Sequence, residues 1–136
     1  MREILLRGKR IGTNGWMYGY LVADIHGAKY PIIIHSSEYN DENNIDIDYD
    51  FIIPETVSQY TGLSDKYGKR IFEGDIVKFK TTLYDFKKCK VEYQDYYAGY
   101  YAVDNKGYEY SMGKFFEYEV IGNIYDNPEL LRSDTK

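Results

Sequence analysis

The sequence predicts a mainly β fold, and its composition and patterning carry this prediction. The chain has 136 residues, of which 43% are hydrophobic, enough for a core in one domain or two small subdomains. Tyrosine, which suits half-buried strands, occurs 17 times, against six Phe and one Trp. Short apolar runs alternate with turns rich in Gly, Asn and Asp, and Pro occurs only three times. We therefore expect antiparallel strands rather than a helical bundle.

Residues 1–53 are predicted to form an N-terminal β-rich segment. Strands are expected at 3–7, 16–23 and 30–35, because each run is apolar or aromatic and the runs are separated by turns that contain Gly or Asn. Pro31 in the third run suits the start of a strand or an edge strand.

The segment "IDIDYDF" at 45–51 alternates cleanly between apolar and acidic residues. Its apolar residues share one face, which we expect to be buried, as in a half-buried strand. They are Ile45, Ile47, Tyr49 and Phe51. The other face carries Asp46, Asp48 and Asp50. These match the first three ligand positions of an EF-hand calcium loop, but the sixth position is Phe51 and the twelfth is Val57. A solvated face, opposite Arg2, Arg7, Lys9 or Arg10 on a neighbouring strand, is therefore favoured.

Residues 54–136 are predicted to form an SH3-like small β-barrel, packed against the first segment in one compact unit. A helix of about two turns is expected at 54–62, because Pro54 suits a first helical position and Gly62 a position just past the end. A last helical turn is expected at "PELL", after Asn127. Strands are expected at 70–80, 87–94, 96–103, 108–112 and 114–125, with a loop at 81–86 and a Gly-containing hairpin turn at 104–107.

The stretch "QYTGLSDKYGKRIFEGDIVKF" (59–79) is the densest in turn residues. Its glycines lie six residues apart, at Gly62, Gly68 and Gly74. A phosphate-binding loop would lead into a helix N-terminus, whereas these glycines lead into strands and turns. We expect a tight turn at 64–69, with Asp65 bonding the backbone and Gly68 at positive φ, and a bend at Gly74–Asp75. The stretch is therefore interpreted as scaffold.

No complete catalytic or metal-binding set is recognisable in the sequence. A structural zinc site needs four Cys or His ligands, and the chain has only His26, His35 and Cys89. Counting leaves a Cys–His nucleophilic pair open, but Cys89 alternates in phase with Val91 and Tyr93, which favours a core position. We expect no enzyme activity, no metal and no cofactor. An enzyme built on scattered carboxylates is the weakest option.

Charge, cysteine content and hydropathy bear on which partners the protein binds and on its cellular location. The net charge of −5 disfavours a general nucleic-acid binder, because such proteins carry a basic surface against phosphates. The single cysteine agrees with a reducing cytosol. No signal peptide and no apolar stretch long enough to span a bilayer is recognisable, so we expect a cytoplasmic protein.

The segment "YQDYYAGYYAV" (93–103) is the strongest binding candidate, and the lysine-rich strands around Lys78–Lys90 precede it. Aromatic rings beside basic residues on a small barrel are typical of single-stranded nucleic-acid binding. They are equally typical of a protein interface, where Tyr is enriched, and some rings are expected simply to fill the core. The predicted partner-binding residues are Tyr96, Tyr97, Tyr100, Tyr101, Lys88 and Lys90.

Three blocks of the sequence resemble the YopX family of phage and prophage proteins. They are "MREILLRGKR" with the following "GWMYGYL", then "PETVSQYTGLSDKYGKRIFEGDIVK", and "YEVIGNIYDNPELL", in the family's order across essentially the whole chain. The resemblance implies a β-rich phage or prophage protein and brings no enzymatic activity, cofactor or ligand with it. The matching residues look architectural: Tyr60, Thr61, Gly62, Leu63, Gly68, Gly74, Asp75, Gly122, Asn123 and Pro128.

The sequence thus predicts a non-enzymatic binding or assembly module in the cytoplasm of a bacterial host. Its partner would be a host or phage protein, or a second copy of the chain. The alternative is a single-stranded nucleic-acid binder that uses Lys78–Lys90 and Tyr93–Tyr101, which the acidic net charge disfavours.

Overall fold

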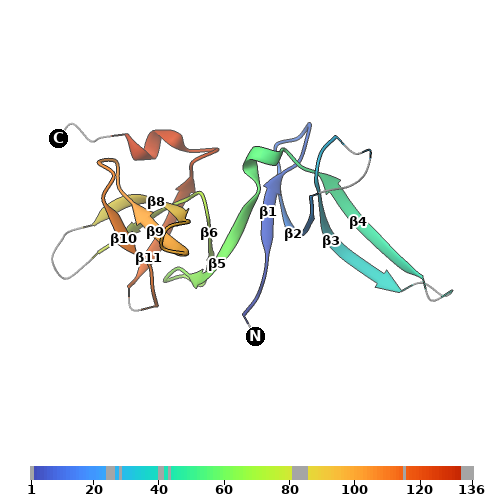
Figure 1. Ribbon diagram of the computed structural model, residues 1–136, viewed down its shortest axis with the longest axis horizontal. Coiled ribbons are helices and arrows are strands. Elements are labelled where there is room, and N and C mark those ends of the chain that lie inside the picture. Colours follow the sequence, from blue (N-terminus) through green and yellow to red (C-terminus); the bar gives the residue numbers. More distant parts are fainter. Residues whose placement is uncertain are drawn as a thin grey trace. The chain divides into compact units, whose positions relative to one another are not determined.

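The computed structural model describes residues 2–23, 27, 29–39, 42, 44–80, 86–114 and 116–132. The chain divides into two compact units, Met1–Gln59 and Tyr60–Lys136, which we call the first and second unit. Both are built of antiparallel strands (Figure 1). The prediction of a mainly β protein is therefore confirmed. In the described part of the chain, no helix is long and apolar enough to cross a membrane.

The first unit is an antiparallel sheet with the strand order β4-β3-β2-β1-β5. Its strands are β1 (Leu6–Lys9), β2 (Trp16–Val22), β3 (Ile32–Tyr39), β4 (Ile45–Phe51) and the start of β5 (Ser58–Ser64). β5 pairs with β1 through Gln59 opposite Leu6 and Ser58 opposite Arg7.

Directly after β4 the chain pairs with the residues that follow β1. Ile52 forms an isolated bridge with Arg10, and the Ile11 N–H donates to the Phe51 carbonyl over 3.0 Å. The Ile52 N–H donates in the other direction, to the Pro31 carbonyl over 2.9 Å. The end of β4 is thus fixed from both sides, while the rest of β4 forms the edge of the sheet order.

The core of the first unit is small and is packed closely around two glycines. Ile33 and Ile52 are fully buried. A Cβ on Gly8 would lie 2.3 Å from the Ile52 Cγ2, and one on Gly19 would lie 2.1 Å from the Ile34 carbonyl oxygen. The strands approach this closely only because both positions lack a side chain.

The second unit contains a five-stranded sheet with the order β10-β9-β8-β7-β11. β6 (Arg70–Phe72) pairs with β5 through Phe72 opposite Tyr60. The sheet's strands are β7 (Asp75–Phe79), β8 (Lys87–Gln94), β9 (Gly99–Val103), β10 (Glu109–Ser111) and β11 (Tyr118–Asn123). No pairing in the described residues joins β10 to β11, so the expected barrel is not closed.

The core of the second unit lies on one face of this sheet. Its buried members are Ile71, Val77, Phe79, Cys89, Val91, Ala102 and Tyr118. The Phe79 ring is central to it, with centroids 5.6 Å from both Tyr110 and Tyr118. Cys89 is fully buried, which confirms its predicted core position.

The predicted helix at 54–62 is wrong. Pro54–Thr56 forms a single 3-10 turn, η1, and β5 follows two residues later. Val57, Tyr60 and Thr61 are β-branched or aromatic and favour a strand, so the chain leaves the turn extended despite the well-placed proline.

Most of the other predicted elements are confirmed, with shifted ends. The segments at 45–51 and 87–94 match β4 and β8 in full. "PELL" forms a 3-10 turn, η2 (Pro128–Leu131). The strand expected at 3–7 lies two to three residues later, as β1. The loop expected at 81–86 lies outside the described residues except for Phe86.

The glycine-rich stretch contains an aspartate-capped turn, as predicted. The Asp65 Oδ1 accepts the N–H groups of Tyr67 and Lys69, each over 2.9 Å, and Gly68 has a φ of +82°. The Asp65 Oδ2 accepts the Val120 N–H from β11 over 3.1 Å. Burial raises the pKa of Asp65, but the three backbone donors outweigh it and hold the pKa below its usual value.

Two further turns use the same chemistry. At the predicted hairpin turn, the Asp104 Oδ1 accepts the N–H groups of Lys106 and Tyr108 over 2.9 and 3.0 Å, and Gly107 has a φ of +89°. At the predicted bend before β7, the Asp75 Oδ2 accepts the Phe72 N–H over 2.8 Å. These aspartates therefore work as backbone caps.

Candidate functional site

The turn between β8 and β9 carries the first candidate surface. Tyr96 and Tyr97 are 67% and 59% exposed, and their ring centroids are 4.5 Å apart. The Tyr97 ring also contacts Tyr101 on β9, with centroids 4.9 Å apart. We call these three residues the tyrosine patch.

Carboxylates border the tyrosine patch. The Tyr96 hydroxyl donates to the Glu109 carboxylate, and this hydrogen bond is the main reason that the pKa of Tyr96 rises to about 12. The Gln94 side chain donates to Glu109 and to Glu92, over 3.2 and 3.1 Å. The Lys90 Nζ lies 2.7 Å from the Glu92 Oε1. Acidic groups therefore stand between the lysines of β8 and the tyrosine rings, and they disfavour a phosphate backbone at the patch.

The predicted binding residues do not all lie together. Tyr101 pairs with Glu92, and Tyr100 pairs with Tyr93, so Tyr100 and Tyr101 lie on opposite faces of the sheet. Tyr100 packs against the core, and its ring lies 5.2 Å from that of Tyr93. Lys88 shares the face of Glu92 and Tyr101 because it lies four residues before Glu92 on β8. Tyr100 therefore lies on the core face of the sheet, opposite the face that carries Lys88 and Tyr101.

Lys88 belongs to a basic groove that the sequence did not reveal. The groove has a volume of about 140 Å³ and lies beside η2. Its lining is Phe86, Lys87, Lys88, Asp104, Asn105, Lys106, Leu130, Leu131 and Arg132. Four of these residues are cationic, and the carboxylate of Asp104 is already occupied by the backbone of its own turn. The groove is therefore locally positive on an acidic chain.

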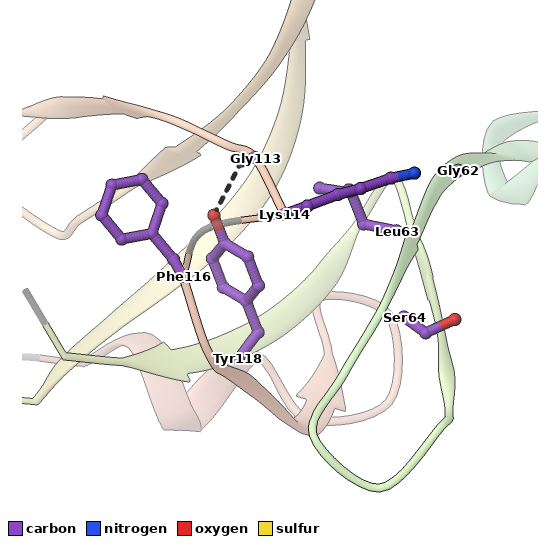
Figure 2. A pocket seen from close by; sticks show the side chains of 7 residues that line it. All are labelled: Gly62, Leu63, Ser64, Gly113, Lys114, Phe116 and Tyr118. Carbon is purple, nitrogen blue, oxygen red and sulfur yellow. Dashed lines mark hydrogen bonds between the residues drawn. The ribbon is translucent and has the colours of Figure 1, made fainter.

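A second pocket, of about 270 Å³, lies between β5 and the loop that precedes β11 (Figure 2). It is lined by Gly62, Leu63, Ser64, Gly113, Lys114, Phe116 and Tyr118. The Tyr118 hydroxyl accepts the Gly113 N–H over 3.1 Å, and burial raises the pKa of Tyr118. Among the described residues, its lining holds no carboxylate, imidazole or thiol. Its titratable side chains are Lys114 and Tyr118.

Cys89 and His35, the other side chains that could take part in chemistry, are buried or bonded to neighbouring residues. Burial raises the pKa of the Cys89 thiol to about 12, so the nucleophilic thiolate is scarce at neutral pH. His35 lies 3.0 Å from the Asp50 Oδ2, and Arg10 lies 3.1 Å from the Asp50 Oδ1. His26 lies outside the described residues. Within the described part of the chain, no three His, Cys, Asp or Glu side chains are grouped to hold a metal ion.

The apolar face of β4 corrects the sequence interpretation. The alternation is as predicted, and the Tyr49 and Phe51 rings lie edge to face with centroids 5.9 Å apart. However, the expected burial is wrong: Ile45, Ile47, Tyr49 and Phe51 are between 46% and 56% exposed. Of the basic residues predicted to lie opposite the aspartates, Arg10 pairs with Asp50.

The exposed apolar residues of β4 share a face with those of β2, across the half-buried Ile32 and Ile34 of β3. Tyr20 pairs with Ile34, which pairs with Tyr49, and paired residues of antiparallel strands project to the same face. We call this surface the outer face; its residues are Tyr18, Tyr20, Val22, Ile32, Ile34, Ile45, Ile47, Tyr49 and Phe51. It stays uncovered because the small core, with Gly8 and Gly19, lies on the opposite face. A glycine within a strand often marks a close approach of another backbone, so Gly19, between the aromatic residues of β2, is the feature of the sequence that indicates on which face the strands pack closely.

The fold and its surfaces define a small antiparallel β protein with exposed aromatic faces. A family model described as YopX protein matches residues 9–132, and the chain belongs to the YopX family. This confirms the resemblance of the three sequence blocks. Among solved structures, the crystal structure of protein EF1440 from Enterococcus faecalis is similar, with a TM-score of 0.63 and 22% identity over 97% of this chain and 100% of that chain. That likeness shows the fold alone. No curated protein matches the sequence.

Proposed function

We propose that the chain is a non-enzymatic protein-binding module of phage or prophage origin, and that the outer face of the first unit is its principal contact surface. The supporting observation is the exposure of large apolar side chains on β2 and β4, on either side of the half-buried Ile32 and Ile34 of β3. Monomeric proteins rarely expose a large contiguous apolar surface, and Tyr, Phe and Ile at the centre of such a surface are typical of protein interfaces.

The tyrosine patch of the second unit is proposed as a further contact. The Tyr96 and Tyr97 rings are exposed and lie edge to face, the half-buried Tyr101 supports Tyr97, and Tyr96 is oriented by its hydrogen bond to Glu109. Tyrosine provides a large contact area at a low entropic cost, because it has few rotatable bonds. The partner is a host or phage protein.

The test is capture of partners from a lysate of bacteria that carry the phage. The double variant Tyr20→Ser, Tyr49→Ser removes two rings of the outer face, and Tyr67→Ser removes a ring that is 74% exposed on the Asp65 turn. We expect the double variant to bind the captured protein about 30-fold more weakly, because aromatic hot spots contribute 2 kcal/mol or more. Tyr67→Ser should bind as the wild type does. Equal binding by the double variant and the wild type would reject the outer face.

The basic groove favours a second candidate function, binding of single-stranded nucleic acid. Lys78 lies over the Phe86 ring at 5.0 Å, and Phe86 itself lines the groove, so cations and an aromatic ring are grouped there. A labelled oligonucleotide should then shift at low salt, and Lys88→Glu with Arg132→Glu should abolish the shift. The absence of a shift at low salt would remove this candidate.

A further inference from the structure

We infer that β4 is a receptor edge that takes up an added strand of a partner protein, and that this strand alternates Lys or Arg with apolar residues. The inference rests on the proposed function and specifies the partner's chemistry. An extended segment added to a sheet edge gains main-chain hydrogen bonds along its length, while its alternating side chains determine specificity.

The backbone of β4 is arranged for such pairing. β4 ends the strand order of the first unit, and its one strand partner among the described residues is β3. The Phe51 carbonyl points away from β3, because it accepts the Ile11 N–H. Backbone groups of successive residues point to opposite edges of a strand. The N–H and C=O groups of Ile45, Ile47 and Tyr49 therefore point to the outer edge, where unpaired groups form a template for another strand.

The two faces of β4 differ in chemistry. Its apolar side chains belong to the outer face, so an added strand with apolar residues at alternate positions would extend that face. The opposite side carries Asp46, Asp48 and Asp50. Asp46 and Asp48 are exposed, and both Asp48 and Asp50 also interact within the chain, Asp50 with Arg10. Basic side chains on the added strand would lie directly across from the exposed carboxylates, and opposite charges in cross-strand pairs are stabilising.

Charge also disfavours a second copy of the chain as the strand that pairs with β4. Antiparallel pairing of β4 with its own copy would place aspartate rows opposite each other, and each chain already carries a net charge of −5. Like charges directly opposite in a sheet are destabilising. The acidic row therefore discourages self-pairing and selects a basic strand, as charged edge residues do in other sheets.

The direct test uses the full chain and a short blocked peptide that alternates Lys and Val. We expect the peptide to bind, and amide exchange followed by NMR to slow at Ile45, Ile47 and Tyr49. Two peptides serve as controls: one alternates Glu and Val, and one has the Lys and Val residues in separate blocks. Each control should bind at least about 10-fold more weakly, because charge complementarity or alternation is lost. Equal binding of the Glu–Val peptide, or no slowing at the three amides, would overturn the inference.

Variants of the edge sharpen this test. Ile47→Pro removes an outward N–H, so it should abolish binding of the Lys–Val peptide and keep the circular-dichroism spectrum, whereas Ile47→Val keeps the N–H and the binding. Asp46→Asn with Asp48→Asn should weaken binding and reduce its salt dependence. If Ile47→Pro binds the peptide as the wild type does, the edge is not the site. If Ile47→Pro does not fold, binding of the Lys–Val peptide and its two control peptides to the wild-type chain tests the strand addition by itself.

The inference and the proposed function fail in different ways. If Tyr20→Ser with Tyr49→Ser loses the captured protein while Ile47→Pro keeps it, the outer face binds and strand addition is overturned. A dimer at neutral pH that Ile47→Pro dissociates would make a second copy the occupant, and would also overturn the inference. If Ile47→Pro binds neither the Lys–Val peptide nor the captured protein, the result supports the strand addition and the proposed function together.

Discussion

β4 in the first unit and β8 in the second have the same kind of sequence but different surroundings. Each alternates apolar with charged or polar residues; β4 does so throughout, and β8 does so from its second residue, Lys88. In β8, Cys89 and Val91 are buried in a core made by several strands. In β4, Ile47 and Tyr49 are about half exposed. Alternation therefore determines which residues share a face, whereas the surrounding strands determine whether that face is covered.

The difference originates in the residues that oppose each face. In the second unit, the large rings of Phe79 and Tyr118 fill the space over the sheet. In the first unit, glycines bring the strands close on the inner side, at Gly8 and Gly19, and little volume remains for further side chains. The apolar residues of β4 are left on the outside, where a partner can cover them.

The largest change in the free energy of unfolding is expected in the second unit, whose core is filled by large aromatic rings. Phe79→Ala removes a buried ring and should lower the free energy of unfolding by about 3–5 kcal/mol. Phe51→Ala removes a ring from the outer face and should change it by less than about 0.5 kcal/mol. Urea unfolding measures both. Similar losses for the two variants would mean that the outer face is part of a core.

A smaller effect is expected at the close contact in the first unit. Gly19→Ala places a methyl group against the Ile34 carbonyl and should destabilise the fold by about 1–3 kcal/mol. Gly113→Ala is the matched control, because a Cβ there meets no atom within 4 Å. Thermal unfolding of the two variants checks this. A neutral Gly19→Ala would show that the glycine does not control the packing.

The smallest effect concerns acid stability of the second unit. The pKa of Asp65 is lowered in the folded state, so its contribution is complete above its unfolded pKa near 3.8 and is lost as the pH falls through the folded pKa. Asp65→Asn should cost about 1–2 kcal/mol at pH 7, because three backbone donors lose a charged acceptor. Its stability should then depend less on pH below about 4. An unchanged acid profile in Asp65→Asn would contradict this role.

Turn chemistry and periodicity account for what the sequence could predict. The turns at Asp65 and Asp104 follow from local residue types, because most of their hydrogen bonds join nearby residues. β4 and β8 follow from their two-residue alternation, although neighbouring strands supply their pairing. The helix at 54–62 failed because the β propensity of Val57 and Thr61, and the pairing of β5 with β1 and β6, outweigh a favourable Pro54.

The candidate sites were less predictable, because they depend on contacts between distant segments. Tyr100 and Tyr101 are adjacent in sequence, and only the pairing of β9 with β8 shows which one faces the core. The basic groove combines Lys88 with Arg132, which are far apart in the chain. The outer face required knowledge of what lies on the other side of β2 and β4.

We propose that the first unit leaves its apolar face open for a partner. Hydrogen exchange of the full chain, free and bound to the protein captured from the lysate, tests this most directly. We predict slower exchange in the partner complex along β4, at Ile45, Ile47 and Tyr49, and unchanged exchange in the core strands β7 and β8. Slowing confined to the second unit, with β4 unaffected, would contradict the claim.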